Sequence, residues 1–210
     1  MVKASGKKCS VDAVLFDFGG VLADEGFVNG LAAIARKYGL DQDRFVSLGH
    51  ELVHETGYVT GRGKEADYWE AIRTSSGVNG DDDTLRREIL TRFVLRPWMF
   101  ELVDRLRDLG LATAILSDQT NWLDELDARY DLFGRFDLVF NSFHMGKSKK
   151  EPSHFADVAR MMDLSPEKCL FVDDREENCA IAASVGFKTL WYRNRESFER
   201  EMNIYCPGIH

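Results

Sequence analysis

The chain has 210 residues, of which 44% are hydrophobic and 30% are charged, a balance typical of a globular protein with a large core. Its formal net charge of −8 argues against a nucleic-acid partner, because such a partner requires a basic face. No apolar run approaches the roughly 20 residues of a membrane span, so no membrane partner is expected either.

The N-terminal residues 1–10 are polar and carry three lysines. They lack the apolar middle section of a secretory signal, so we expect a frayed tail and a cytoplasmic protein. The cysteines form no CxxC pair, and two of them fall inside predicted core elements; they are Cys9, Cys169, Cys179 and Cys206. We therefore expect free thiols in a reducing compartment rather than disulfides or a zinc site.

The first element is a buried strand predicted at residues 11–16, where five of the six residues are apolar. Asp17 ends this strand and is followed directly by Phe18, Gly19 and Gly20. Ligands of open α/β sheets bind beyond the carboxyl ends of the strands, and glycine lets the backbone approach a ligand closely. Asp17 is thus a candidate nucleophile or metal ligand, although a capped strand end explains this stretch alone equally well.

The sequence pattern of residues 24–95 predicts helices and almost no strand. Apolar spacing predicts helices near residues 31–38, 42–54 and 64–74, and a fourth that begins after Asp81-Asp82-Asp83 and bears Leu85, Ile89 and Phe93. Between them, Gly57–Gly63 is a loop with three glycines, and it is a hinge, a substrate-specificity element or a plain loop. His50 and His54 have the i, i+4 spacing of a metal pair, but no third ligand is evident, which favours solvated histidines.

Strands and helices alternate afterwards. Strands are predicted at residues 111–116, 136–140, 169–172 and 187–192, with helices before and between them. Such alternation with short connections indicates a parallel sheet covered by helices. The predicted fold is therefore a Rossmann-like α/β core with a doubly wound parallel sheet, formed by residues 1–23 and 96–210, and a small inserted helical cap at residues 24–95.

Polar groups follow four of the predicted strands: Asp17, Ser117, the lysine-rich loop at residues 147–150, and the pair Asp173-Asp174. A doubly wound sheet brings these ends to one edge, where the carboxylates would repel one another unless a hard cation such as Mg²⁺ lay between them. A lysine and a hydroxyl beside that cation suit a phosphate group. An attacking carboxylate in such a site is a recognised route to an aspartyl-phosphate.

In this order the motifs resemble the haloacid dehalogenase superfamily, in its phosphatase branch with a helical cap after the first strand. The resemblance spans nearly the whole chain and rests on Asp17–Val21, Ile115–Ser117, Gly146–Phe155 and Phe171–Asn178. The last segment is similar to sugar-phosphatase-like members and to the N-domain of epoxide hydrolases. Lys150 stands where the family usually has a proline.

The resemblance implies roles for these residues. Asp17 would be the nucleophile, while the Ser117 hydroxyl and the amide of Asp118 would bind phosphate together with Lys149. Mg²⁺ would be bound by Asp17, the Gly19 carbonyl and Asp174, and Asp173 would act on the metal through water. The implied activity is a Mg²⁺-dependent phosphatase for a small phosphorylated metabolite, and the cap would select that metabolite. We expect a monomer or a homodimer.

Position 19 departs from the family pattern, because the usual phosphatase has there a second Asp that serves as general acid and base. The loss removes proton transfer worth roughly a hundredfold to ten-thousandfold in rate. Four acids are candidate substitutes: Asp24, Glu25, Glu51 and Glu55. Two alternatives stay open, namely a degenerate binder of a phosphorylated ligand and a metal-independent 2-haloacid dehalogenase, although the Asp173-Asp174 pair argues against the second.

Overall fold

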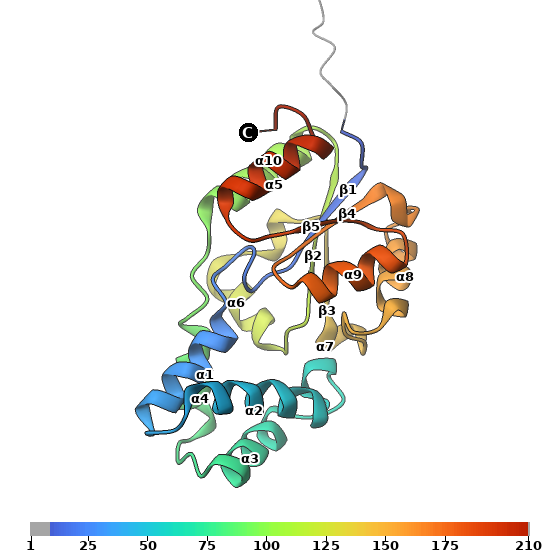
Figure 1. Ribbon diagram of the computed structural model, residues 1–210. Helices are drawn as coiled ribbons and strands as arrows, with labels where there is room; N and C mark the ends of the chain where they lie inside the picture. Colours follow the sequence, from blue (N-terminus) through green and yellow to red (C-terminus); the bar gives the residue numbers. More distant parts are fainter. Residues whose placement is uncertain (1–8, 210) are drawn as a thin grey trace, which may run out of the picture.

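The computed structural model describes residues 9–209, in which five short strands form one parallel sheet (Figure 1). The strands are β1 (Ala13–Phe16), β2 (Ala112–Ser117), β3 (Leu138–Asn141), β4 (Cys169–Asp173) and β5 (Lys188–Trp191). Their spatial order is β3-β2-β1-β4-β5, so the chain starts in the centre, builds one side of the sheet and then returns to build the other. The predicted α/β fold with a doubly wound parallel sheet is confirmed.

Helices cover both faces of this sheet because successive side chains of a strand point to opposite faces. On one face, Val14 and Phe16 of β1 share a core with α5 (Pro97–Asp108), α6 (Trp122–Tyr130) and α10 (Arg195–Tyr205). On the other face, Leu15 packs in a second core with α8 (Pro152–Met161) and α9 (Glu176–Ser184). Short helical segments complete the core: α7 (Ser142–Met145), η2 (Phe133–Arg135) and η3 (Pro166–Lys168).

The insertion after β1 is helical, as expected, and forms the lower part of Figure 1. It contains α1 (Gly26–Lys37), α2 (Gln42–Glu55), the single turn η1 (Tyr58–Thr60), α3 (Glu65–Ser76) and α4 (Asp82–Leu90). Asp81 caps α4 by accepting the backbone N–H of Thr84 at 2.8 Å, which is the role expected of the acidic run. The two connections to the core run side by side, because Ala23 and Leu95 form an antiparallel bridge.

Aromatic side chains join the cap to the core. Trp69 of α3 stacks on Trp122 of α6 with ring centroids 5.8 Å apart, and both side chains are fully buried. The Tyr58 hydroxyl donates to Asn121 Oδ1 at 2.5 Å, and the Ser142 hydroxyl donates to the Val59 carbonyl at 2.7 Å. The glycine loop predicted at residues 57–63 is thus docked onto the core through η1.

Two expectations about helices differ from the structure. The fourth cap helix ends at Leu90, so Phe93 lies beyond it and packs instead on Phe18, with ring centroids 5.5 Å apart. Helix α10, which follows the last strand, was not predicted. Its inward face has few apolar residues, chiefly Phe198 and Met202, and this is a weak helical signal.

The expectation of free thiols is wrong for two of the four cysteines. Cys9 and Cys206 form a disulfide across 197 residues, because the segment before β1 runs beside the end of α10 and Ser10 N donates to the Tyr205 carbonyl at 2.8 Å. Cys169 and Cys179 are free and buried. Of the predicted N-terminal tail, residues 1–8 lie outside the described part of the chain. Within residues 9–209, no helix is both long enough and apolar enough to cross a membrane.

Candidate active site

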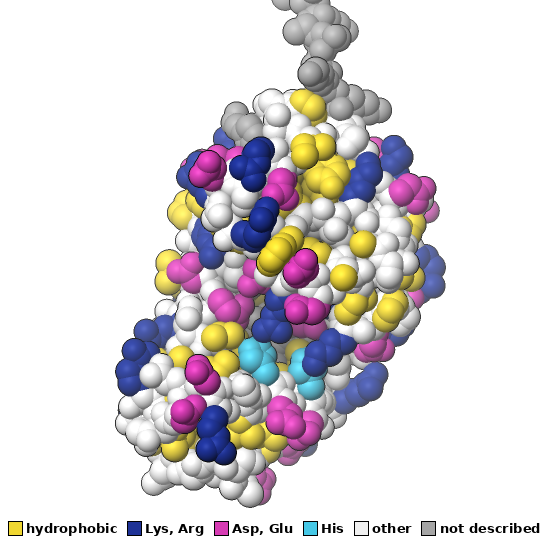
Figure 2. Space-filling view, in the orientation of Figure 1, with side chains coloured by type: hydrophobic (Ala, Val, Ile, Leu, Met, Phe, Trp, Pro, Cys, Tyr) yellow, Lys and Arg dark blue, Asp and Glu magenta, His cyan; other side chains and the backbone are white. Residues whose placement is uncertain are grey.

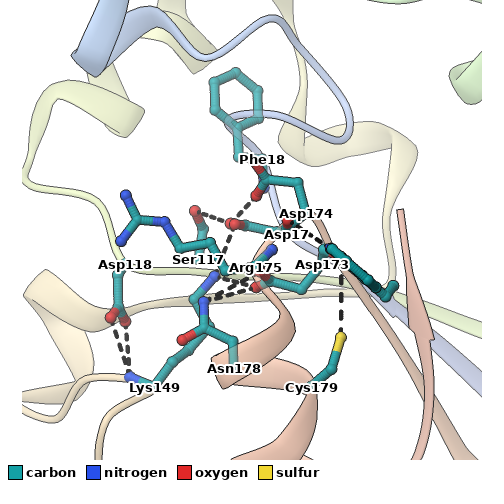
Figure 3. A network of polar contacts seen from close by, with 11 residues as sticks. Asp17, Phe18, Ser117, Asp118, Lys149, Asp173, Asp174, Arg175, Asn178 and Cys179 are labelled. Atoms are coloured by element: carbon teal, nitrogen blue, oxygen red, sulfur yellow. Dashed lines mark hydrogen bonds and ion pairs between the residues drawn. The ribbon is translucent and has the colours of Figure 1, made fainter. Parts of the chain in front are cut away.

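Asp17 stands directly after β1 at the centre of the carboxyl edge of the sheet (Figure 3). Its Oδ1 accepts the Ser117 hydroxyl at 2.6 Å and the Phe18 backbone N–H at 2.7 Å. Its Oδ2 forms an ion pair with Lys149 Nζ at 2.8 Å. Both oxygens of this carboxylate are therefore oriented by groups that come from other strand ends or from its own loop.

Lys149 links Asp17 to Asp173, at the end of the neighbouring strand β4. Its ammonium lies 2.6 Å from Asp173 Oδ2, and the lysine side chain is only 2% exposed. The backbone N–H of Lys149 donates to both carboxylate oxygens of Asp118, at 2.9 and 3.1 Å, which fixes the lysine loop against the end of β2. The carboxylate of Asp118 thus positions Lys149, while a phosphate-binding role for its backbone amide stays a prediction.

Asp173 is fully buried, and both of its carboxylate oxygens have protein partners. Oδ2 accepts from Lys149, and Oδ1 accepts the Arg175 backbone N–H at 2.7 Å and the Asn178 amide at 3.1 Å. Asp174 is partly exposed and lies against the loop that follows Asp17. A Cβ on Gly20 would come within 2.3 Å of Asp174 Oδ2, and Gly20 has φ +83°, so only glycine fits there.

These acids form a compact group, since one oxygen each of Asp17, Asp173 and Asp174 lies within 4.8 Å of the others. Burial is the main cause that raises the pKa of Asp17 to about 8; Lys149 opposes this shift, and the two other acids add to it. Burial and then the Asp173 charge raise the pKa of Asp174. Burial alone would lower the pKa of Lys149, but Asp17 and Asp173 outweigh it and raise that pKa. One ammonium therefore faces three carboxyl groups, and ionisation of all three would leave an excess of negative charge.

A divalent cation fits this excess charge. Carboxylate oxygens are hard ligands, and Mg²⁺ in proteins is usually bound through one or two carboxylates with the remaining positions held by water and substrate. The oxygens of both Asp17 and Asp173 are engaged by protein donors, whereas Asp174 is partly exposed, so Asp174 is the acid best placed for direct contact with the cation. The direct contact of Asp174 with the metal and the action of Asp173 through water stay predictions. The contribution of the Gly19 carbonyl stays a prediction.

A pocket opens between these strand ends and the cap. From the core it is lined by Asp17, Gly19, Ser117, Asp118 and Lys149, so all the expected core residues except the Asp173-Asp174 pair border it. From the cap side it is lined by Glu25, Phe27, His50, Val53, His54 and Val59. Figure 2 shows histidines beside basic and acidic side chains at this junction.

The charges at the mouth of the pocket are mixed but include strong cations. Lys150 and Arg175 line it with exposed side chains, and His50 Nε2 lies 3.4 Å from an Arg175 guanidinium nitrogen. Burial, and then the Arg175 charge, lower the pKa of His50 to about 4, so that histidine is neutral near pH 7. Burial likewise lowers the pKa of His54 to about 4. The two histidines therefore line the pocket and are half-buried rather than fully solvated.

The sequence reasoning missed two residues of the site. Asn178 holds both oxygens of Asp173 from the first turn of α9, and its spacing from Asp173 was the available signal. Arg96 holds the loop after Asp17 by donating to the carbonyls of Gly20 and Val21, the latter at 2.9 Å. Nothing in the sequence around Arg96 indicates this contact. His144, by contrast, lies outside the pocket and pairs with Asp124 at 2.9 Å.

The parallel sheet, the helical insertion after β1 and the buried aspartate that follows β1 together place the chain among α/β enzymes whose site lies between the carboxyl ends of the strands and an inserted cap. A family model described as haloacid dehalogenase-like hydrolase matches residues 11–186, and the chain belongs to this family.

The sequences of similar proteins match different lengths of this chain. Rat bifunctional epoxide hydrolase 2 is 30% identical over 118 residues, which is 53% of this chain but only 21% of that relative, so the chain spans about a fifth of its length. Flavin mononucleotide hydrolase 1 of Arabidopsis thaliana, a chloroplast protein, is 21% identical over 213 residues, covering 97% of this chain and 83% of the relative.

A solved structure of the haloacid dehalogenase family enzyme bt-2542 from Bacteroides thetaiotaomicron has the same fold, with a TM-score of 0.74 and 21% identity. The similarity covers 91% of this chain and 98% of that one. Another structure of the same enzyme, with a TM-score of 0.66, 22% identity and coverage of 88% and 95%, holds magnesium and inorganic phosphate.

Proposed function

We propose that this protein is a Mg²⁺-dependent phosphatase that hydrolyses a small phosphorylated metabolite through an aspartyl-phosphate on Asp17. One observation carries the proposal: the Asp17 carboxylate is held between the Ser117 hydroxyl and the Lys149 ammonium, beside the two acids that end β4. A nucleophile, two phosphate-binding donors and a cation site thus meet at one pocket. The exposed cations Lys150 and Arg175 at the pocket mouth also favour an anionic ligand.

The reaction has two steps. An oxygen of Asp17 attacks phosphorus, and the bond from phosphorus to the leaving oxygen breaks. Water then attacks the phosphorus of the aspartyl-phosphate and restores the Asp17 carboxylate. Ser117 and Lys149 orient the phosphoryl group and offset the charge on its oxygens. When bound, Mg²⁺ would supply further positive charge to those oxygens from the side of Asp17 and Asp174.

In this mechanism the cap limits the access of water and selects the substrate. Its side chains Phe27, Val53 and Val59 close the pocket over the nucleophile, which limits the access of water during the covalent step. Since the cap supplies the outer wall, the shape of that wall selects the metabolite.

The test is a panel of phosphorylated metabolites assayed with Mg²⁺ and with excess chelator. Wild type should release phosphate only with Mg²⁺, and Asp17→Asn should abolish turnover because the amide is not a nucleophile. Beryllium fluoride should be held on the Asp17 carboxylate in a crystal structure. Asp108→Asn, a change on the exposed side of α5, is the matched control and should keep full activity.

The alternatives give different results. A phosphorylated ligand that binds but is never hydrolysed would identify a non-catalytic binder. Halide release from a 2-haloacid that persists in chelator would identify a dehalogenase. Either outcome, or turnover retained by Asp17→Asn, would contradict the proposed phosphatase.

A further inference from the structure

Glu25 is the residue before α1. Its side chain folds back over the loop at residues 17–20, which we call the nucleophile loop. One carboxyl oxygen, Oε1, accepts the Val28 backbone N–H at 3.4 Å, so the side chain caps the helix. The other oxygen, Oε2, lies 2.9 Å from the position that a Cβ on Gly19 would occupy. A carboxyl group therefore fills the space next to Gly19, although residue 19 itself has no side chain.

This carboxyl borders the pocket beside Gly19, which is two residues after Asp17 in the sequence. Gly19 and Glu25 both line the pocket with Asp17, so the carboxyl faces the same space as the attacking group. Expulsion of an alcohol from a phosphate ester leaves an electron pair on the leaving oxygen, which takes up a proton. A donor is required on the pocket side of Asp17.

Four other titratable groups that line the pocket are less suitable, and the exposed side chains of Lys150 and Arg175 lie at its mouth. Asp118 uses both oxygens to accept the Lys149 backbone N–H. The Lys149 ammonium is paired with Asp17 and Asp173. Burial lowers the pKa of His50 and His54 to about 4, so near pH 7 neither ring carries the acidic proton of an imidazolium.

The structure also separates Glu25 from the other substitute acids considered from the sequence. Asp24 pairs with the Arg96 guanidinium at 3.2 Å and does not border the pocket. Glu51 and Glu55 are exposed on α2 and do not border it either. Of the four, Glu25 is the one whose carboxyl lies over the nucleophile loop.

We propose that Glu25 is the proton donor for the leaving oxygen, placed from the cap connection into the space beside Gly19. This assignment rests on the proposed phosphatase function. As the bond from phosphorus to the leaving oxygen breaks, the Glu25 carboxyl gives its proton to that oxygen and an alcohol departs. In the second step the Glu25 carboxylate takes a proton from the attacking water, the bond from phosphorus to Asp17 breaks, and inorganic phosphate leaves.

The experiment compares leaving groups at one pH with Mg²⁺ present. Glu25→Gln keeps an oxygen to accept from Val28 but cannot donate an acidic proton. It should lower kcat for simple alkyl phosphates by about a hundredfold or more, because a poor leaving group needs the proton. It should change kcat for p-nitrophenyl phosphate only a few-fold, because nitrophenolate leaves without one. Glu51→Gln, a matched change on the exposed side of α2, should alter neither.

The two proposals fail in different ways. Wild type without activity on any phosphate ester would refute the phosphatase function itself. An active wild type whose ratio of alkyl to aryl turnover is unchanged in Glu25→Gln would refute only the donor role and leave Glu25 as a helix cap.

A relocation of the acid gives an independent test. Gly19 does not have the left-handed backbone of Gly20, so it can carry a side chain, but Glu25 obstructs the space. The double variant Gly19→Asp, Glu25→Ala should recover at least tenfold in alkyl phosphate turnover over Glu25→Ala alone. No recovery, with an intact thermal transition, would overturn the assignment of this space to the proton donor.

Discussion

Asp173 and Asp174 are neighbours in the sequence but have different surroundings. Asp173 is fully buried and bonded to Lys149, Arg175 and Asn178, so its charge is part of the internal framework of the site. Asp174 borders the nucleophile loop and is partly exposed. The two acids should therefore respond differently to the same substitution.

Asp174→Asn should remove the effect of Mg²⁺ on stability while leaving the metal-free protein folded. Binding of a ligand at about a hundred times its dissociation constant raises the free energy of unfolding by about 2.7 kcal/mol. The melting temperature of wild type should thus rise with Mg²⁺, and that of Asp174→Asn should not. Thermal unfolding with and without Mg²⁺ measures this directly.

Asp173→Asn should destabilise the protein even without metal, because it leaves the buried Lys149 ammonium with a weaker partner. Loss of one member of a buried ion pair costs about 3 to 5 kcal/mol, and Asp17 retains part of that pairing here, so we expect the lower end. Equal melting temperatures for the two metal-free variants would contradict this division of roles.

The residues at strand ends could be predicted from the sequence because a parallel sheet fixes where its carboxyl ends lie. Asp17, Ser117 and Asp173 each follow a clear apolar run, and the structure brings them together. The position of Glu25 could not be predicted with the same certainty. It depends on how the chain turns into α1, and four acids near the cap were equally good candidates in the sequence.

At the scale of elements, the contact between η1 and α7 fixes the position of the cap on the core. Gly61 ends η1 with φ +65°, and a Cβ there would lie 2.3 Å from the Phe143 carbonyl oxygen in the core. Gly77 ends α3 with φ +72°, and a Cβ there would meet nothing within 4 Å. The two glycines have similar backbones but different neighbours.

Gly77→Ala should therefore lose about 1 to 2 kcal/mol of stability from a left-handed backbone with a side chain, and Gly61→Ala should lose more, because its methyl group also clashes with the Phe143 carbonyl. Gly61→Ala should in addition raise KM and lower kcat, since the methyl group displaces the Val59 turn that lines the pocket. Gly77→Ala should keep the kinetic constants of wild type. Steady-state kinetics and chemical unfolding of both variants provide the comparison. Equal kinetic constants for the two variants would show that the contact between η1 and the core does not affect catalysis.

Elements with regular apolar spacing were predictable, and those without it were not. All five strands and the four cap helices lie near their expected residues, because burial on a sheet face or helix face imposes a period on the sequence. Helix α10 was not predicted, because Phe198 and Met202 are the only large apolar side chains that it buries among mostly charged and polar residues. The docking of η1 depends on the Phe143 and Ser142 contacts, which join distant parts of the chain and leave no local pattern.

At the scale of the whole molecule, the Cys9–Cys206 disulfide restrains both ends of the described chain. A cross-link over so long a loop stabilises the fold by about 5 kcal/mol in the chain-entropy model. Reductant should lower the melting temperature of wild type to that of Cys206→Ser, and it should leave the variant unchanged. Denatured, unreduced wild type should show two free thiols, and four would contradict the cross-link.

This bond also makes the polypeptide between Cys9 and Cys206 a closed ring, and the cap is one arc of that ring. In a linear chain, one proteolytic cut inside the cap would leave two fragments joined only by packing. In the ring, the same cut opens the circle and leaves a single covalent molecule. The cap can be removed only by two cuts, one in each of the connections that meet at the Ala23–Leu95 bridge.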